Sequence, residues 1–211
     1  MEEDPSIGIV VAEDHALVRA GLRLLVSRHP RLRWLGEAAD GVAALALVRD
    51  RRPQLLVLDL GLPRLDGMEV MQALAREQLP TRVLVVTARQ DPASVRAALA
   101  LGAQGYLLKT DDADELLAAL LTVADGGWHV SAELASVFES APRDGEAEEP
   151  LTTREQDIAT RVGRGYSSKR IGLDLGISEH TVRKHRENIA RKLGLRNAAE
   201  LVAWTIRHRM V

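Results

Sequence analysis

The stretch Ile7-Gly8-Ile9-Val10-Val11-Ala12-Glu13-Asp14 is a short apolar run that ends in two carboxylates. Three later apolar runs also end in a polar residue: Leu55–Leu58 before Asp59, residues 83–86 before Thr87, and residues 106–108 before Lys109. Short aliphatic runs are typical of strands buried in a parallel sheet. Because ligands of such sheets bind beyond the carboxyl ends of the strands, we expect these polar side chains to meet at one site.

Segments with helical spacing of apolar residues alternate with these runs. They lie at residues 16–27, 42–50, 68–77, 94–101 and 113–124, and a further strand is indicated at 34–38. Five repeats of strand and helix predict an α/β domain over residues 6–125. Its core would be a doubly wound, five-stranded parallel sheet with helices on both faces.

A different organisation begins after residue 125. Residues 141–150 are acidic, poor in apolar side chains and flanked by prolines, which predicts a linker over 126–150, with a short helix at 131–140 as one option. Residues 151–211 then predict four helices. Their caps and ends are indicated by Thr153 with Gln156, by Ser167 or Ser168 with Gly176, by Ser178 with Gly194, and by Asn197. The short turn at 176–178 suggests a helix-turn-helix unit.

Charge separates the same two regions. Residues 151–211 hold 13 Lys and Arg against 6 Asp and Glu, whereas residues 1–150 hold 15 against 24. A basic module behind an acidic one makes the second region a candidate for binding nucleic acid. The chain has no cysteine, which excludes disulfides and thiolate metal sites. With an acidic start and no long apolar run, we expect a cytoplasmic protein without a membrane partner.

The polar residues after the strands suit phosphoryl chemistry. Asp14 and Asp59 offer hard oxygen ligands for Mg²⁺, with Glu13 acting through water. An aspartate can also attack phosphorus, a reaction that Lys109 and the metal assist by neutralising charge and Thr87 by donating a hydrogen bond. Each residue alone has a simpler explanation as a cap, loop residue or surface cation. Together, at four strand ends, they predict one Mg²⁺-dependent phosphoryl site.

Residues 7–125 resemble the receiver domain of two-component response regulators, which has a flavodoxin-like fold. The resemblance rests on the segments 9–15, 57–63 with Asp66-Gly67, Thr87-Ala88 and 102–109. It implies that Asp59 accepts a phosphoryl group from a sensor histidine kinase.

The resemblance also implies roles for the neighbours of Asp59. Mg²⁺ would be held by Asp14, Asp59 and the Gly61 carbonyl, with Glu13 close by. Thr87 and Tyr106 would form a switch pair in which Thr87 bonds the new oxygens and Tyr106 follows inward. Lys109 would be the ion-pair partner in the site.

An enzyme is the main alternative. Haloacid-dehalogenase-type phosphatases use a similar set of residues, but they need a second Asp two residues after the nucleophile, where this chain has Gly61. Their acidic pair also comes last in the chain, whereas Glu13-Asp14 comes first. We therefore expect no enzyme beyond a receiver that catalyses its own phosphorylation and dephosphorylation. A DNA-binding protein with a vestigial receiver, and a phosphate sink whose tail binds a protein, stay open as further alternatives.

The third predicted helix of the basic region has two distinct faces. At 100° per residue, Val182, Ile189 and Leu193 share one face, and the opposite face carries His180, Arg183, Lys184, Glu187 and Arg191. A helix that reads the major groove needs such a polar face, from which Arg and Lys donate to guanine. Ser178, Thr181, Lys169 and Arg170 are better placed for phosphates. A solvated basic surface would give the same pattern.

Residues 151–204 resemble the LuxR-type helix-turn-helix family through the segments 151–155, 165–171, 176–185 and 190–194. His185 and Lys192 lie in these segments and complete the DNA-binding candidates, with a structural role as the alternative for His185. Gly172 stands where the family usually has Ala, and Glu187 would accept from a cytosine amino group or repel a phosphate.

The two resemblances together indicate a NarL/FixJ-type response regulator that binds double-stranded promoter DNA, as a homodimer when phosphorylated. Two control mechanisms stay open: phosphorylation could favour dimers, or it could free the recognition helix from the receiver.

Overall fold

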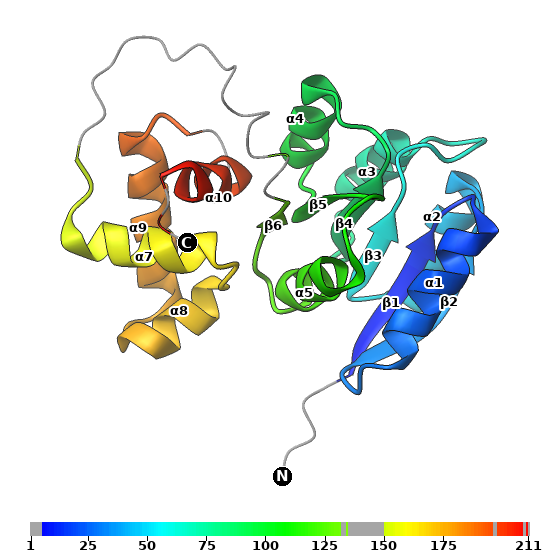
Figure 1. The fold of residues 1–211 in the computed structure, drawn as a ribbon, viewed down its shortest axis with the longest axis horizontal. Coiled ribbons are helices and arrows are strands. Elements are labelled where there is room, and N and C mark those ends of the chain that lie inside the picture. Colours follow the sequence, from blue (N-terminus) through cyan, green and yellow to red (C-terminus); the bar gives the residue numbers. More distant parts are fainter. Residues whose placement is uncertain (1–5, 132–133, 135–149, 196–197, 209, 211) are drawn as a thin grey trace.

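The apolar runs form a parallel sheet in the computed structural model of the protein, which describes residues 6–131, 134, 150–195, 198–208 and 210. The strands are β1 (Ile7–Ala12), β2 (Leu32–Ala38), β3 (Leu55–Leu58), β4 (Arg82–Thr87), β5 (Gly105–Leu108) and β6 (His129–Val130). Their order in the sheet is β2-β1-β3-β4-β5-β6, and neighbouring strands are parallel (Figure 1).

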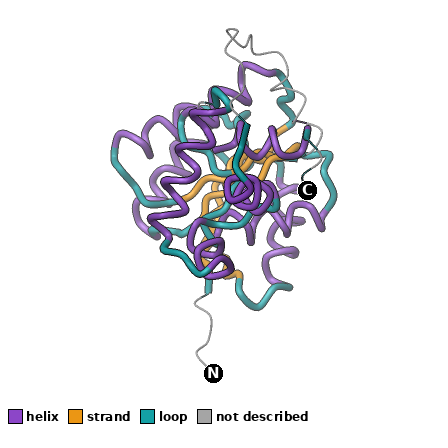
Figure 2. The backbone as a smooth tube through the Cα atoms, turned by 90° about the vertical axis from the view of Figure 1, so that its left-hand side faces the viewer, coloured by secondary structure: helices purple, strands orange, loops and turns teal. Residues whose placement is uncertain are grey.

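Helices cover both faces of the sheet because alternate strand residues point to opposite sides. Val10 and Ala12 pack in one core with α2 (Gly41–Arg51), α3 (Gly67–Arg76) and α4 (Pro92–Ala100). Ile9 and Val11 pack in a second core with α1 (Ala16–Ser27) and α5 (Ala113–Ala124). Figure 2 shows the strands enclosed between helices. The predicted doubly wound α/β fold is confirmed.

The sheet has one more strand than predicted. Residues 126–130 were expected to belong to the linker, but β6 extends the sheet: Val130 pairs with Tyr106, and the amide of Ser131 donates to the Tyr106 carbonyl over 3.3 Å. A strand of two residues is too short to leave an alternating pattern in the sequence. Apart from Ser131, Leu134 and Pro150, the predicted helix at 131–140 and the acidic linker lie outside the described residues.

The basic region forms the predicted helices α7 (Thr153–Gly163), α8 (Ser168–Leu175), α9 (Glu179–Lys192) and α10 (Ala198–Arg207) around a core of its own. The first capping box was predicted one residue too late. Thr152, not Thr153, caps α7, and its reciprocal partner is Glu155 instead of Gln156. Both pairs have the three-residue spacing of a capping box, so spacing alone did not choose between them.

Gly172 on α8 has a packing reason. A Cβ at this position would lie 2.7 Å from the backbone oxygen of Ile177, which belongs to the turn between α8 and α9. Gly172 therefore allows α8 to approach this turn closely, where an alanine would force the backbone apart.

The two domains touch through a backbone contact between Gly127 and Gly165. A Cβ on Gly127 would lie 1.9 Å from the Gly165 oxygen, and a Cβ on Gly165 would lie 2.7 Å from Cγ2 of Thr122. Trp128, next to Gly127, packs against the hydrophobic cores of both domains. Figure 1 shows the helical domain beside the β6 edge of the sheet. In the described part of the chain, no helix is long and apolar enough to cross a bilayer.

Candidate functional site

Three of the predicted side chains meet in a buried ion-pair network at the carboxyl ends of the strands. The Lys109 ammonium lies 2.7 Å from Oε2 of Glu13 and 2.8 Å from Oδ2 of Asp59. The carboxylates are 3% and 5% exposed, and the Lys109 side chain is 18% exposed. Backbone hydrogen bonds from Asp59 to Ala12 and from Lys109 to Thr87 continue the sheet and set this geometry.

The ammonium is stabilised in its charged form. Burial by itself opposes a charge on Lys109, but the hydrogen bonds to Asp59 and Glu13 outweigh this effect, so the pKa of Lys109 is raised. Removing the ammonium would leave two buried carboxylates close together without their cation, an arrangement of high free energy.

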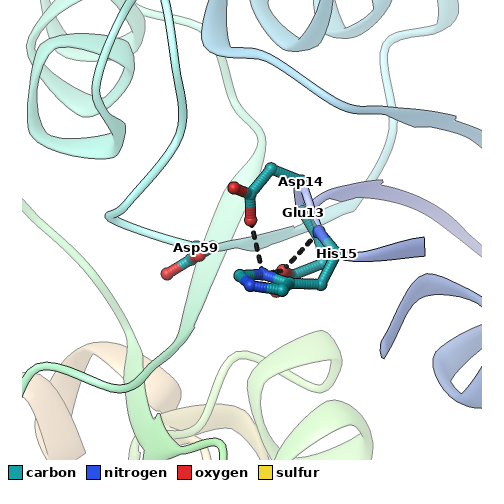
Figure 3. Close-up of side chains that lie close together, drawn as sticks. All are labelled: Glu13, Asp14, His15 and Asp59. Carbon is teal, nitrogen blue, oxygen red and sulfur yellow. Dashed lines mark hydrogen bonds and ion pairs between the residues drawn. The ribbon is translucent and has the colours of Figure 1, made fainter. Parts of the chain in front are cut away.

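A cluster of four possible ligands lies at the same place. Ligand atoms of Glu13, Asp14, His15 and Asp59 are all within 4.8 Å of one another. Figure 3 shows Glu13, Asp14 and His15 grouped together after β1, with Asp59 beside them. Carboxylate oxygens are the hard ligands that Mg²⁺ prefers, so the donor set of this acidic pocket is compatible with that ion.

His15 is a member of this cluster that the sequence did not single out. Its Nδ1 lies 2.6 Å from Oδ1 of Asp14 and 2.9 Å from Oε1 of Glu13, while 67% of the side chain is exposed. The hydrogen bond to Glu13 and the charge of Asp14 raise the pKa of His15. The only signal in the sequence was its position next to the acidic pair.

Gly61 lies in a tight loop against Asp59. The Gly61 amide donates to Oδ1 of Asp59 over 3.1 Å, and the Gly67 amide donates to the Leu60 carbonyl over 3.1 Å. The loop is closed so tightly that a Cβ on Gly67 would lie 2.4 Å from the carbonyl oxygen of Asp59. Gly61 therefore lies beside the carboxylate, and the role of its carbonyl as a Mg²⁺ ligand stays a prediction.

Thr87 and Tyr106 each form a hydrogen bond with the backbone of Arg89. Among the described residues, no hydrogen bond joins Thr87 to Tyr106. The Arg89 amide donates to the Thr87 hydroxyl over 3.3 Å, and the Tyr106 hydroxyl donates to the Arg89 carbonyl over 3.0 Å. Burial, followed by the charge of Asp91, raises the pKa of Tyr106. The sequence prediction was that Tyr106 moves inward on phosphorylation, but in this structure its ring is already fully buried.

The buried and exposed faces predicted for the helix now seen as α9 are confirmed. On α9, Val182 and Ile189 are buried, as is Leu193 at its end. The residues predicted to face outward are exposed: His180, Arg183, Lys184, Glu187 and Arg191. Ser178 caps the helix by accepting from the Thr181 amide over 3.0 Å, and the two hydroxyls bond over 2.7 Å. His185 is half-buried.

Residues 179–187 of α9 face the receiver across a cleft of about 680 Å³. Three DNA-binding candidates line this cleft: Lys169, Arg183 and Glu187. From the receiver side the cleft is lined by Arg82, Gln104, Asp125, Gly126 and Trp128. We call this arrangement, in which these three candidates share a cleft with the receiver, the closed arrangement.

Lys192 differs from the other DNA-binding candidates. Its side chain is 12% exposed, and its ammonium lies 2.9 Å from Oε2 of the buried Glu155. Glu155 also accepts from the Thr152 amide in the capping box of α7. The contacts therefore give Lys192 a structural role inside the helical domain, where the sequence had suggested a contact with DNA.

Glu155→Ala should destabilise the helical domain by about 3–5 kcal/mol, because it leaves the Lys192 ammonium buried without this carboxylate. Burial alone would raise the pKa of Glu155, but hydrogen bonds from Thr152 and Lys192 hold it below its ordinary value of 4.5. The carboxylate thus stabilises the fold above pH 4.5 and loses this effect as the pH falls through its folded pKa. Urea unfolding of the variant and the parent protein, followed at several pH values, measures both effects.

Glu179→Ala is the matched control for this variant. Glu179 pairs with Arg183 one turn later on the exposed surface of α9, and such pairs contribute about 0.3–0.5 kcal/mol. Equal destabilisation by the two variants would show that the Glu155–Lys192 pair contributes no more stability than an exposed ion pair.

Comparisons with known proteins agree with this architecture. Residues 9–121 match the response regulator receiver domain family, and residues 149–205 match the LuxR family of bacterial regulatory proteins. The transcriptional regulatory protein UhpA of Salmonella typhimurium is 34% identical over 204 residues, which cover 97% of each chain. The chain is a response regulator of the NarL/FixJ family. Its relatives include the probable transcriptional regulatory protein NarL of Mycobacterium tuberculosis, 34% identical over 97% of this chain and 96% of that protein.

Solved structures of response regulators have the same fold. The receiver domain of the putative response regulator NarL from Mycobacterium tuberculosis covers 58% of this chain and 98% of its own, with a TM-score of 0.56 and 39% identity. The response regulator ChrA of a heme-sensing two-component system covers 98% of this response regulator and 99% of its own chain, with a TM-score of 0.54 and 30% identity. The family thus extends over both domains.

Proposed function

We propose that Asp59 is the phosphoacceptor through which a sensor histidine kinase controls DNA binding by α9. The observation that carries the proposal is the Lys109 ammonium held between the two buried carboxylates of Glu13 and Asp59. A lysine placed 2.8 Å from the nucleophile is positioned to neutralise charge on an incoming phosphoryl group. The assignment of this chain to the response regulators supports the same role.

The transfer proceeds by attack of an Asp59 carboxylate oxygen on phosphorus. A P–O bond forms to Asp59 while the N–P bond of the donor phosphohistidine breaks, and the electron pair of that bond stays on the imidazole nitrogen. The product is an acyl phosphate. The hydroxyl of Thr87, at the end of the neighbouring strand β4, donates to the phosphoryl oxygens.

The acidic pocket would hold Mg²⁺ through Asp14, Asp59 and the Gly61 carbonyl, with Glu13 close by. When bound, the cation would neutralise negative charge on the transferred group. Lys109, which is itself held by Glu13, orients the Asp59 carboxylate through the ion-pair network. Their low exposure excludes water that would otherwise compete for these contacts.

Control of DNA binding follows from the cleft between the domains. In the closed arrangement Lys169 and Arg183 face the receiver, so promoter DNA and the receiver compete for the same surface. Of the two control mechanisms that the sequence left open, the cleft favours release of the recognition helix as the first step. A homodimer of released domains would then bind two half-sites about one helical turn, roughly 34–36 Å, apart.

Within the released domain the DNA-contacting residues divide by position. Arg183, Lys184 and Arg191 are exposed on α9 and would reach base edges or phosphates in the major groove, with Glu187 and His185 beside them. Lys169, Ser178 and Thr181 lie at the starts of α8 and α9, where they would bind phosphates. As a member of a family of bacterial regulatory proteins, the chain would act in the cytoplasm.

Asp59→Asn tests the proposal. The parent protein should gain a phosphoryl group from acetyl phosphate in the presence of Mg²⁺ and bind promoter DNA more tightly afterwards. The variant should show neither change, because an amide does not attack phosphorus. Mass spectrometry of the intact chain and DNA-binding titrations at fixed salt measure the two effects.

Asp50→Asn is the control, since Asp50 is a 71% exposed side chain on α2 and the substitution makes the same change of charge. If the parent protein gains no phosphoryl group, the receiver is vestigial. If Asp59→Asn dimerises and binds DNA like the phosphorylated parent, Asp59 is not the switch.

A further inference from the structure

Arg19 on α1 donates hydrogen bonds to the backbone of the acidic pair Glu13-Asp14. Its Nη1 donates to the carbonyl oxygens of Glu13 and Asp14 over 2.8 Å and 2.9 Å. Its Nε lies 3.3 Å from Oε1 of Glu37, at the end of β2. The Arg19 side chain is only 16% exposed, although it carries a full charge. One guanidinium thus joins the start of the β1–α1 loop to the neighbouring strand.

These two carbonyls lie where the sheet stops supporting the chain. The pairing of β1 with β2 and β3 ends at Ala12, and the Glu13 amide makes one more bond, to the Ala38 carbonyl over 3.0 Å. Beyond it, the orientation of the peptide groups of Glu13 and Asp14 depends on local contacts. A charged donor shared by two successive carbonyls fixes both peptide planes, and with them the directions of the two side chains.

We propose that Arg19 is a positioning residue that orients Glu13 and Asp14 for a divalent cation, an inference that rests on the proposed function of the pocket. Among the described residues, the hydrogen bonds of Arg19 to the pair go to backbone oxygens, so it would act without touching the cation or the phosphoryl group. Groups that orient metal ligands in this way typically change metal affinity by about 10–100-fold.

The contact with Glu37 serves to aim the guanidinium. Glu37 is 38% exposed, so this pair by itself contributes little stability. Its geometric effect is larger, because it holds Nε and so directs Nη1 towards the two carbonyls. These contacts link β2, through Glu37 and Arg19, to the acidic pair.

Arg19→Met tests the inference by direct titration of the full chain with Mg²⁺, or with Mn²⁺ followed by its paramagnetic resonance signal. We expect the dissociation constant of the cation to rise by about 10–100-fold. Phosphorylation of Asp59 by acetyl phosphate should slow at limiting Mg²⁺ and recover at saturating Mg²⁺. A purely structural role would lower the unfolding midpoint without producing this recovery.

Arg23→Met is the matched control. Arg23 lies one turn later on α1, is exposed and stacks over Trp34 at 5.8 Å from the ring centre, so the control removes the same charge from the same helix. Equal cation affinity of the Arg19→Met and Arg23→Met chains would overturn the inference. Full recovery of affinity in Arg19→Lys would also overturn it, because charge alone would then account for the effect.

Glu37→Gln covers the case in which Arg19→Met does not fold. This variant keeps the guanidinium and removes the carboxylate that orients it. Its cation affinity should therefore lie between that of the Arg23→Met control and the lower affinity of Arg19→Met. Affinity equal to that control would count against the inference. Failure of the parent protein to bind Mg²⁺ or to be phosphorylated is a separate result, which would contradict the proposed function itself.

Discussion

Gly67→Ala should lower the rate at which Asp59 is phosphorylated by about 100-fold, the typical cost of misplacing a reacting group by about 1 Å. A Cβ on Gly67 would lie 2.4 Å from the carbonyl oxygen of Asp59 and 2.7 Å from Cα of Leu60. Both are backbone atoms, so the loop after Asp59 must shift to make room. The rate of mass gain with acetyl phosphate and saturating Mg²⁺ measures the effect.

Gly21→Ala provides the comparison, because a Cβ on Gly21 in α1 has no other atom within 4 Å. It should leave phosphorylation unchanged and stabilise the receiver slightly, by up to about 1 kcal/mol. A Gly67→Ala chain that is phosphorylated at the rate of Gly21→Ala would show that the loop does not position the nucleophile.

Gly127→Ala should increase DNA binding by the unphosphorylated chain. The added methyl group would lie 1.9 Å from the Gly165 oxygen in the helical domain, so the domains close only with a shift of backbone. It would also lie 2.9 Å from Cγ2 of Thr122 within the receiver. Overpacking of this kind costs about 1–3 kcal/mol. That cost would shift the equilibrium between closed and open arrangements by about 5–150-fold towards the open one. Titration of unphosphorylated protein with promoter DNA measures the change in affinity.

Small-angle scattering of the same chain separates opening from other effects, since an open chain has a larger radius of gyration. Gly21→Ala again serves as control. If Gly127→Ala binds DNA no better than that control while its domains separate, closure does not limit DNA binding, and dimerisation becomes the controlling step.

The fold was largely predictable because its elements are local. Each central strand contains a short apolar run with a polar residue after it, and six of the helices in the described chain begin at Asp or Ser caps. The two wrong predictions, where the linker starts and which residue caps α7, have a physical reason. The two residues of β6 carry no periodicity, and Thr152 and Thr153 offer equivalent capping patterns until packing of Glu155 against Lys192 decides between them.

The site was predictable in its side chains but not in its supports. Glu13, Asp59 and Lys109 follow strands, so the parallel topology alone brings them together. Arg19 acts through backbone carbonyls, and such contacts leave no chemical pattern in a sequence. The glycine contact between the domains depends on how two separately folded units meet, which neither Gly127 nor Gly165 reveals alone.

The short strand β6 moves the boundary of the receiver. β6 pairs with the backbone of Tyr106 at the edge of β5. Without β6, amide and carbonyl groups at this edge would be unpaired. A receiver cut from the chain at residue 125 would expose this edge, which is a template for association with other sheets. We therefore expect a receiver that includes Ser131 to associate less than one that ends at residue 125. Strand β6, at the start of the connection between the domains, thus also covers an edge through which one receiver could pair with the next.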